Sequence, residues 1–156
     1  MREEYLLEMT GITKNFPGVR ALNNVDMKVK PGSIHALVGE NGAGKSTLMK
    51  ILIGMYEADS GKIKFNGKEV NFRKVNDALN AGISMIYQEL SPVPYMTVAE
   101  NIFLGKELCY KNSFLVNDRE MEKKTTELLE QLEINIDPKT KMRDLSTAYT
   151  QMVEIA

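Results

Sequence analysis

Residues 39–47 read G-E-N-G-A-G-K-S-T and decide the fold. The first eight fit the pattern G-x-x-x-x-G-K-[S/T], in which four positions are fixed. An apolar run, residues 34–38, precedes the pattern, and a segment with helical character, residues 46–55, follows it. A buried strand, a glycine-rich loop and a helix in this order predict a phosphate-binding loop. The alternative, a glycine-rich loop that only turns the chain, does not explain the fixed positions or this setting.

The chemistry of the loop follows from its residue types. Glycines let successive backbone N–H groups turn toward phosphate oxygens, where a Cβ would obstruct the approach. The helix that follows adds the partial positive charge of its N-terminus. We expect Lys45 to reach the β- and γ-phosphates of ATP or a similar nucleotide, and the Ser46 hydroxyl to bind Mg²⁺. The predicted binding residues are Gly39, Glu40, Asn41, Gly42, Ala43, Gly44, Lys45, Ser46 and Thr47.

Composition places the chain among ordinary globular proteins. It has 156 residues, of which 43% are hydrophobic and 26% charged, and a net charge of −1. This balance predicts no broad attraction to nucleic acid or anionic lipid. The single cysteine excludes an internal disulfide and fits a reducing compartment. No apolar h-region follows the N-terminus, and no apolar run approaches the ~18 residues of a membrane span, so we expect neither a signal peptide nor a transmembrane helix.

Strands and turns dominate the first part of the chain. Pro17-Gly18 and Asn66-Gly67 are turn dipeptides between apolar segments, and the second is a strong hairpin signal. Gly82 is expected to stop a short helix. Strands are predicted at residues 5–12, 19–29, 34–38, 63–65, 69–72 and 83–87, and helices at residues 46–55 and 75–81.

Helices are predicted after residue 88. Thr97 and Glu100 offer a capping box for a helix that runs to Leu104, and residues 105–117 read as a loop. Ser146 can cap a last helix. Asp118 can cap a longer helix, one face of which would carry Met121, Thr125, Leu128, Leu129 and Leu132.

This order predicts an α/β fold in two parts. Residues 1–88 are expected to form a nucleotide-binding core with an N-terminal antiparallel β subdomain. Residues 89–156 are expected to form a helical subdomain.

Several blocks together resemble the ATP-binding domain of ABC transporters. They are residues 39–48 (GENGAGKSTL), 87–89 (YQE), 145–146 (LS) and 151–156 (QMVEIA). Three further blocks resemble the ATPase subunits of bacterial monosaccharide importers, with the galactose and methyl-galactoside branch nearest and the ribose and xylose branches close. These are residues 16–22 (FPGVRAL), 97–105 (TVAENIFLG) and 134–138 (INIDP). The fold that the resemblance implies is a partial P-loop ABC ATPase core.

The resemblance assigns roles to residues outside the loop. Phe16 occupies the position that stacks on adenine, and Val19 would pack beside the base; the alternative for Phe16 is an ordinary core aromatic. Gln88 matches a glutamine that contacts Mg²⁺ or the attacking water, against the alternative of a surface glutamine at a strand end. The resemblance thus implies Lys45 and Gln88 as catalytic residues, and Ser46 and Gln88 as metal ligands.

The signature motif, residues 145–149, departs from the family pattern. Ser146 matches the serine that meets the γ-phosphate bound by an opposing domain. The sequence L-S-T-A-Y stands where L-S-G-G-Q is common. Ala148 puts a methyl group where close approach to phosphate is wanted, and Tyr149 replaces the glutamine. The site completed by this signature is therefore expected to differ in efficiency, while binding at the chain's own loop is untouched.

No adjacent Asp-Glu pair occurs in the sequence. The resemblance implies that such a pair, in the Walker B motif, supplies an Mg²⁺-linked aspartate and a general base. It also implies a switch histidine and a second, tandem ATPase domain beyond these residues. The chain is therefore expected to be a first domain truncated before Walker B that binds nucleotide but hydrolyses little. Unpaired apolar strand edges are expected to favour self-association or a swapped dimer.

The resemblance implies an energising ATPase of a sugar importer, with ATP and Mg²⁺ bound. Its expected partners are membrane permease subunits, which the region after Gln88 would face, an extracytoplasmic sugar-binding protein and a second ATPase domain. Its expected place is the cytoplasmic face of the cell membrane. Nucleic acid is not among its expected partners. Two alternatives remain open. One is a non-catalytic nucleotide-binding or regulatory module, and the other is a P-loop kinase, for which no phosphoacceptor site or lid is recognisable.

Overall fold

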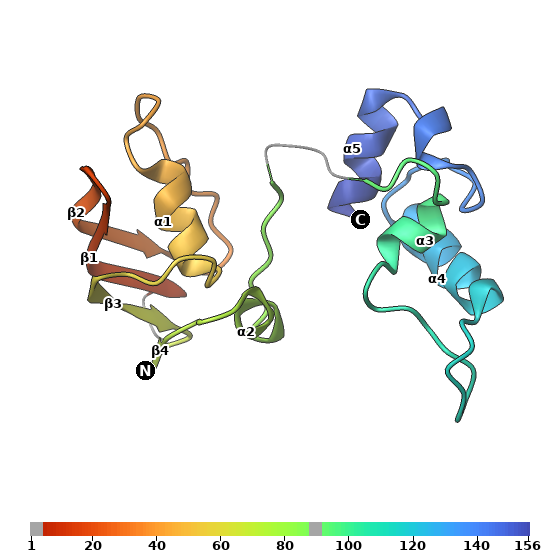
Figure 1. Ribbon diagram of the computed structural model, residues 1–156, viewed down its shortest axis with the longest axis horizontal. Coiled ribbons are helices and arrows are strands. Elements are labelled where there is room, and N and C mark those ends of the chain that lie inside the picture. The colour runs from red at the N-terminus through yellow and green to blue at the C-terminus, as the bar shows by residue number, and fades with distance from the viewer. Residues whose placement is uncertain (1–4, 88–91) are drawn as a thin grey trace. The chain divides into compact units, whose positions relative to one another are not determined.

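The structure, a computed structural model, describes residues 5–87 and 92–156. The chain divides into two compact units, Met1–Met85 and Ile86–Ala156. The first unit holds a β-sheet and two helices, and the second holds the remaining helices (Figure 1). The predicted α/β class, with an antiparallel β part and a helical part, is confirmed.

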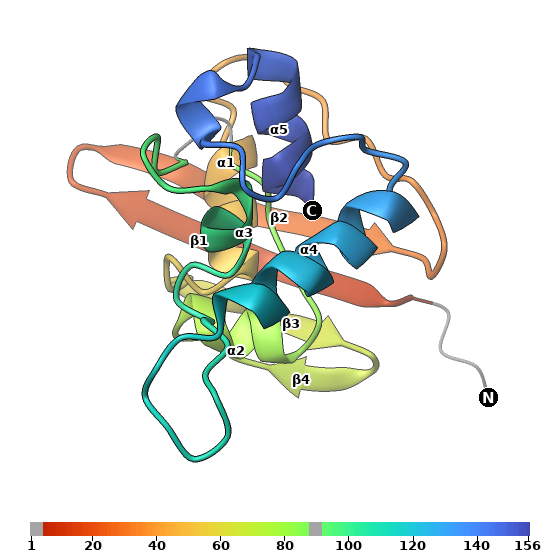
Figure 2. The same cartoon turned by 90° about the vertical axis from the view of Figure 1, so that its right-hand side faces the viewer.

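A four-stranded antiparallel sheet forms the frame of the first unit, in the spatial order β2-β1-β3-β4 (Figure 2). The central strand β1 (Leu7–Phe16) pairs with β2 (Val19–Val29) on one edge and with β3 (Ser60–Phe65) on the other. The short strand β4 (Lys68–Val70) pairs with β3. β1 therefore extends beyond its predicted end and reaches the turn that precedes β2.

Two tight turns connect these strands as predicted. Asn66 and Gly67 have φ angles of 49° and 69°, and a type I′ hairpin turn requires positive φ at both positions. Gly18 has a φ of 82° and closes the turn between β1 and β2. Glycine fits there because it adopts positive φ without steric cost.

Helix α1 (Lys45–Leu52) supplies one side of the core of this unit. Its buried face, Leu48, Ile51 and Leu52, packs in one cluster with the fully buried Met9 and Ile12 of β1. Each such side chain contributes about 1.5–3 kcal/mol of burial free energy. The other buried members of the cluster are Leu7, Leu22, Met27 and Ile63.

α1 ends at Leu52 rather than at Met55. Gly54 takes a φ of 74°, and its N–H donates to the Ile51 carbonyl oxygen at 3.0 Å. The Met55 N–H donates to the Lys50 carbonyl oxygen at 2.8 Å. This pair of bonds is the Schellman arrangement that stops a helix at a glycine. A second, smaller cluster of Ile53, Phe72 and Ala78 then anchors α2 (Val75–Asn80).

The two predicted buried strands at residues 34–38 and 83–87 are wrong. Residues 33–40 have no regular structure, and Ile34 is fully exposed. Residues 83–87 likewise form no strand, and Ile86 is 56% exposed. The physical reason is the lack of partners, since parallel strands are stable where both faces are covered. Within the described residues neither segment pairs with a strand of the sheet, and an isolated pair of strands would be at best marginally stable.

The second unit is built from helices around its own core. They are α3 (Val98–Ile102), α4 (Asp118–Gln131), a 3₁₀ turn (Met142–Asp144) and α5 (Thr147–Ile155). Val98, Leu129, Met142 and Val153 form the buried cluster that joins them. Residues 105–117 form the predicted loop between α3 and α4. Within this loop, an isolated antiparallel β-bridge pairs the backbones of Cys109 and Val116.

The helix caps of this unit follow local chemistry. The predicted capping box is confirmed: Thr97 Oγ1 accepts from the Glu100 N–H at 3.2 Å, and Glu100 Oε2 accepts from the Thr97 N–H at 2.6 Å. α3 nevertheless ends at Ile102 rather than at Leu104. The cap predicted at Asp118 is wrong, because Asn117 Oδ1 accepts the Glu120 N–H at 3.1 Å instead.

The predicted apolar face of α4 is only partly buried. Met121, Thr125 and Leu129 are buried, whereas Leu132 follows the last helical residue and is exposed. The stripe therefore covers fewer residues than its periodicity predicted.

Candidate nucleotide-binding site

The predicted phosphate-binding loop follows the irregular segment 33–38 and leads into α1. Residues 41 and 42 form a turn and residues 43 and 44 a bend, and the Ala43 N–H donates to the Glu40 carbonyl oxygen at 3.1 Å. Gly42 and Gly44 have φ angles of 87° and 89°, in the left-handed region that side chains with a Cβ rarely adopt. The backbone of this loop thus requires glycine at Gly44, the second fixed glycine of the motif, and at Gly42, which lies at a variable position.

The loop is seated on β2 through Gly44. A Cβ placed on Gly44 would lie 2.5 Å from the Ala21 carbonyl oxygen and 2.7 Å from the Leu22 side chain. A Cβ on Gly42 would meet nothing within 4 Å. Gly44 therefore permits close packing against the sheet, and Gly42 leaves open space at the outer side of the loop.

The Lys45 side chain folds back over the loop. Its Nζ donates to the carbonyl oxygens of Gly39 and Glu40, at 2.6 Å and 2.8 Å. The ammonium charge is held beside the turn instead of extending into solvent. A phosphate group that entered the loop would find this cation already in place, with a third donor still to use.

The N-terminus of α1 is open to an anion. Its N-cap residue is Gly44, no side chain caps it, and no acidic residue occupies the first turn. The first backbone N–H groups of a helix lack partners within the helix and carry partial positive charge. The exposed Ser46 lies in this first turn, where a hydroxyl fits a hard cation such as Mg²⁺ that prefers oxygen ligands. Thr47, the last predicted loop residue, is half-buried.

Phe16 and Val19 flank the turn between β1 and β2 and are paired in register. Phe16 is half-buried and outside the buried core, while Val19 is 60% exposed. The Tyr56 ring lies 5.3 Å from the Phe16 ring at an interplanar angle of 72°, and the Lys14 Nζ lies over the Phe16 ring at 5.7 Å from its centroid. The structure thus places two apolar side chains at an accessible turn, in keeping with a surface for a flat ring.

Asp59 is the most perturbed ionisable group near this turn. A hydrogen bond from the Lys14 ammonium, followed by bonds from the Asn15 backbone and side chain, lowers the pKa of Asp59 to about 2. Sequence reasoning missed Asp59, Lys14 and Tyr56. No motif or periodicity marks them, because β1 and the segment after α1 come together only in the folded sheet.

Ser146 caps α5, as predicted. Its Oγ accepts from the Tyr149 N–H at 3.4 Å, and Ser146, Ala148 and Tyr149 are all exposed. They lie in the second unit, whereas the phosphate loop lies in the first. The predicted residue Gln88 lies outside the described residues.

A family model described as ABC transporter matches residues 22–156, which is most of the chain. The chain belongs to the ABC transporter family. The resemblance seen in the motifs is thereby confirmed.

Curated relatives of this ABC transporter chain carry names related to sugar import. It is 64% identical over its whole length to a Halalkalibacterium halodurans protein provisionally named a ribose/galactose/methyl galactoside import ATP-binding protein, of which it covers 30%. It is 52% identical to the galactose/methyl galactoside import ATP-binding protein MglA of Escherichia coli (strain K12), over 98% of this chain and 30% of that protein. The chain thus spans about a third of the length of these relatives.

Solved ATP-binding cassettes share its fold. A nucleotide-free ATP-binding cassette from an ABC transporter superposes with a TM-score of 0.82 at 28% identity, over 97% of this chain and 63% of that chain. The ADP conformation of MJ1267, an ATP-binding cassette of an ABC transporter, gives a TM-score of 0.81 at 29% identity, with the same coverage.

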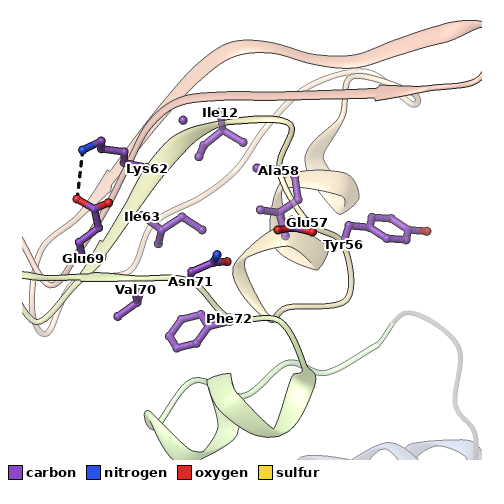
Figure 3. Close-up of a pocket in the computed structure, with 12 residues that line it drawn as sticks. Ile12, Tyr56, Glu57, Ala58, Lys62, Ile63, Glu69, Val70, Asn71 and Phe72 are labelled. Atoms are coloured by element: carbon purple, nitrogen blue, oxygen red, sulfur yellow. Dashed lines mark hydrogen bonds and ion pairs between the residues drawn. The ribbon is translucent and has the colours of Figure 1, made fainter.

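A cavity of about 150 Å³ lies elsewhere in the first unit of this ABC chain (Figure 3). Ile63 and Phe72 contribute apolar walls, and an ion pair between Lys62 and Glu69 at 3.3 Å stands beside it. No residue of the phosphate loop lines it. It is therefore distinct from the phosphate loop, although Tyr56 both lines it and contacts the Phe16 ring.

Residues 5–87 and 92–156 contain no group of three or more His, Cys, Asp or Glu side chains arranged to hold a metal ion. In the same residues, no helix has the length and apolar character to cross a membrane.

Proposed function

We propose that this chain is the ATP-binding, energising domain of an ABC transporter that imports a monosaccharide. The observation that carries the proposal is the phosphate loop with its folded-back Lys45 and uncapped α1 N-terminus. The names of the relatives support sugar import, since they describe ribose, galactose and methyl galactoside import ATP-binding proteins.

In this proposal the loop binds the phosphates of ATP. The backbone N–H groups at the start of α1 donate to phosphate oxygens, and Lys45 contributes its ammonium to the β- and γ-phosphates. Ser46 would hold Mg²⁺, and that ion supplies neutralisation of phosphate charge when it is bound. The open space beside Gly42 leaves room for a triphosphate at the loop.

Phe16 and Val19 would bind the adenine. Stacking needs an accessible aromatic face and gains from burying apolar surface. The half-buried Phe16 ring, braced by Tyr56, meets the first need, and the exposed Val19 offers an apolar neighbour. Because stacking reads shape rather than a hydrogen-bond pattern, we expect modest preference among purine nucleotides.

The signature residues would act on a second ATPase domain. Ser146 and Ala148 lie at the exposed N-terminus of α5, where backbone N–H groups are available to a γ-phosphate bound by the opposing domain. Gln88 would contact Mg²⁺ or the attacking water of the chain's own site. ATP binding would close the two domains head to tail, and hydrolysis would reopen them.

The remaining partners follow from the import role. Permease subunits would receive the motion through the region after Gln88, and an extracytoplasmic binding protein would deliver the sugar. The domain would then work at the cytoplasmic face of the membrane as a peripheral subunit. Studied alone, the 156 residues are expected to bind nucleotide and to hydrolyse it slowly, because no adjacent Asp-Glu pair is present to supply a general base.

Calorimetry of ATP binding, with and without Mg²⁺, tests the proposal. The chain should bind ATP more tightly with Mg²⁺, and Lys45→Ala should abolish binding while leaving the circular dichroism spectrum unchanged. Lys68→Ala is a matched control, because Lys68 is an exposed lysine of β4 in the same unit and lies outside the loop. Equal binding by the wild type and by Lys45→Ala would rule out this phosphate site. Turnover comparable to that of a complete ABC ATPase, lost in Lys45→Ala, would contradict the expected slow hydrolysis.

A further inference from the structure

The carboxylate of Asp59 holds the last residues of β1 before the turn. Asp59 Oδ1 accepts from Lys14 Nζ at 3.0 Å. Asp59 Oδ2 accepts from both the backbone N–H and the side-chain Nδ2 of Asn15, at 2.7 Å and 2.9 Å. The Asp59 N–H donates in turn to the Thr13 carbonyl oxygen at 2.9 Å. One residue thus fixes three consecutive residues of β1, up to the position before Phe16.

The same network crosses to β2. Asn15 Oδ1, on the amide that Asp59 orients, accepts from Arg20 Nε at 3.1 Å. Asn15 and Arg20 are partners in the strand register, and Phe16 and Val19 are the next pair toward the turn. Phe16 and Val19, the proposed adenine-binding residues, are therefore next in register to a pair that hydrogen bonds connect to Asp59.

The segment that carries Asp59 also touches the Phe16 ring. Tyr56 stands three residues earlier in this segment, which follows α1, and its ring meets Phe16 nearly at right angles. Figure 3 shows the Tyr56 ring directed away from Ile63 and Phe72, the apolar side of the neighbouring cavity. Lys14, bound by Asp59, is the cation over the Phe16 ring. Residues 56–59 therefore fix both the backbone and the ring of the base site.

We infer that Asp59 is a positioning residue for the base of the nucleotide, acting through Lys14 and Asn15 to hold Phe16 ready for stacking. The inference rests on the proposed function, since it assumes that Phe16 meets a purine. The turn at residues 17–18 is exposed, and a half-buried aromatic ring beside it loses conformational freedom when a ligand stacks on it. A ring that is ordered beforehand avoids that cost, which is the advantage of preorganisation. Asp59 thus raises the affinity for the base without touching it.

Asp59 affects binding of the base and not binding of the phosphates. Ordering one side chain in advance is worth about two- to tenfold in affinity. Loss of Asp59 should therefore weaken ATP binding by about two- to tenfold and leave inorganic tripolyphosphate binding unchanged. A residue that merely stabilised the first unit would affect both ligands alike, so the ratio of the two affinities is the informative quantity.

Calorimetry with Mg²⁺ on the whole chain, with ATP and inorganic tripolyphosphate as probes, provides the test. The variants are Asp59→Asn, Phe16→Ala and their double variant. Asp26→Asn is the matched control, because Asp26 is also exposed and also accepts a backbone N–H, that of Gly11 at 2.6 Å, in the same sheet. Asn15→Ala is the second variant if Asp59→Asn fails to fold by circular dichroism. Asn15 is exposed, and its truncation breaks the link from Asp59 to Arg20.

The inference is supported if Asp59→Asn, or Asn15→Ala in its place, weakens ATP but not tripolyphosphate, if Asp26→Asn changes neither, and if Asp59→Asn adds no loss to Phe16→Ala. Unchanged ATP binding in Asp59→Asn, or equal weakening of both probes, overturns it while the proposed function stands. A wild-type chain that binds ATP no better than tripolyphosphate overturns the base site, and this inference with it, while the phosphate site stands. A wild-type chain that binds neither probe overturns the proposed function and this inference with it.

Discussion

Gly44 approaches Ala21 so closely that a β-carbon on Gly44 would lie 2.5 Å from the Ala21 carbonyl oxygen. This contact seats the phosphate loop against β2, the strand that begins at the turn of the proposed base site. Gly44 also has a φ of 89°, which a residue with a side chain adopts only with strain. The last glycine of the motif is thus required by packing as well as by backbone conformation.

Gly44→Ala is expected to destabilise the first unit by about 3 kcal/mol, the sum of left-handed backbone strain and a clash with a strand. Gly42→Ala is the matched control, because Gly42 has nearly the same φ, 87°, but open space around its α-carbon. It should lose only about 1 kcal/mol. Urea unfolding of the two variants measures the difference. Equal losses would show that the contact with Ala21 relaxes without cost.

The ion pair of Asp59 predicts a dependence of stability on pH. The pKa of Asp59 is about 2 in the folded chain, against an ordinary value of 3.8, chiefly because of the hydrogen bond from Lys14. A carboxyl whose pKa is lower when folded stabilises the fold above its unfolded pKa. That contribution is lost as the pH falls from about 4 toward 2. The melting temperature of the wild type should therefore exceed that of Asp59→Asn at pH 6, and the gap should close below pH 4. A gap as large at pH 2 as at pH 6 would show that the charge of Asp59 is not what stabilises the fold.

Local chemistry made much of the fold predictable. The Asn66-Gly67 turn and the Thr97–Glu100 capping box each depend on residues within a few positions of one another. The phosphate loop was predictable for the same reason, since its glycines and Lys45 form one continuous motif. The cap of α4 was misplaced by one residue because Asn117 and Asp118 are both good caps, and only the geometry of the chain selects between them.

The features that could not be predicted from the sequence depend on interactions between distant segments. Residues 34–38 and 83–87 have the composition of buried strands, but a strand forms only where a partner lies beside it. Asp59 and Tyr56 could not be assigned to the base site from sequence, because their partners Asn15 and Phe16 lie some forty residues earlier. Periodicity describes one element at a time and does not report which elements meet.

The exposed apolar segment before the phosphate loop predicts self-association. Ile34 is fully exposed and Val38 is 89% exposed, and an extended apolar segment with unpaired backbone groups can pair with another chain. Light scattering at rising concentration should show a growing mean mass that Ile34→Lys together with Val38→Lys reduces. Phe114→Lys, which changes an equally exposed side chain in the second unit, should not reduce it. A constant monomer mass for the wild type at high concentration would contradict the prediction.

Thr125 is buried in α4, and its hydroxyl has no hydrogen-bond partner within the described structure. An unpaired buried hydroxyl costs free energy, and valine has the same shape without that group. Thr125→Val is therefore expected to raise the free energy of unfolding of the second unit by about 1 kcal/mol. Thr126→Val is the matched control on the next residue. Its hydroxyl is exposed and donates to the Glu122 carbonyl oxygen at 3.0 Å, so its replacement should change stability by less than about 0.5 kcal/mol. Urea unfolding followed by circular dichroism compares the two. A loss of stability in Thr125→Val would mean that the hydroxyl has a hydrogen-bond partner in solution, such as a water molecule within the core of this unit.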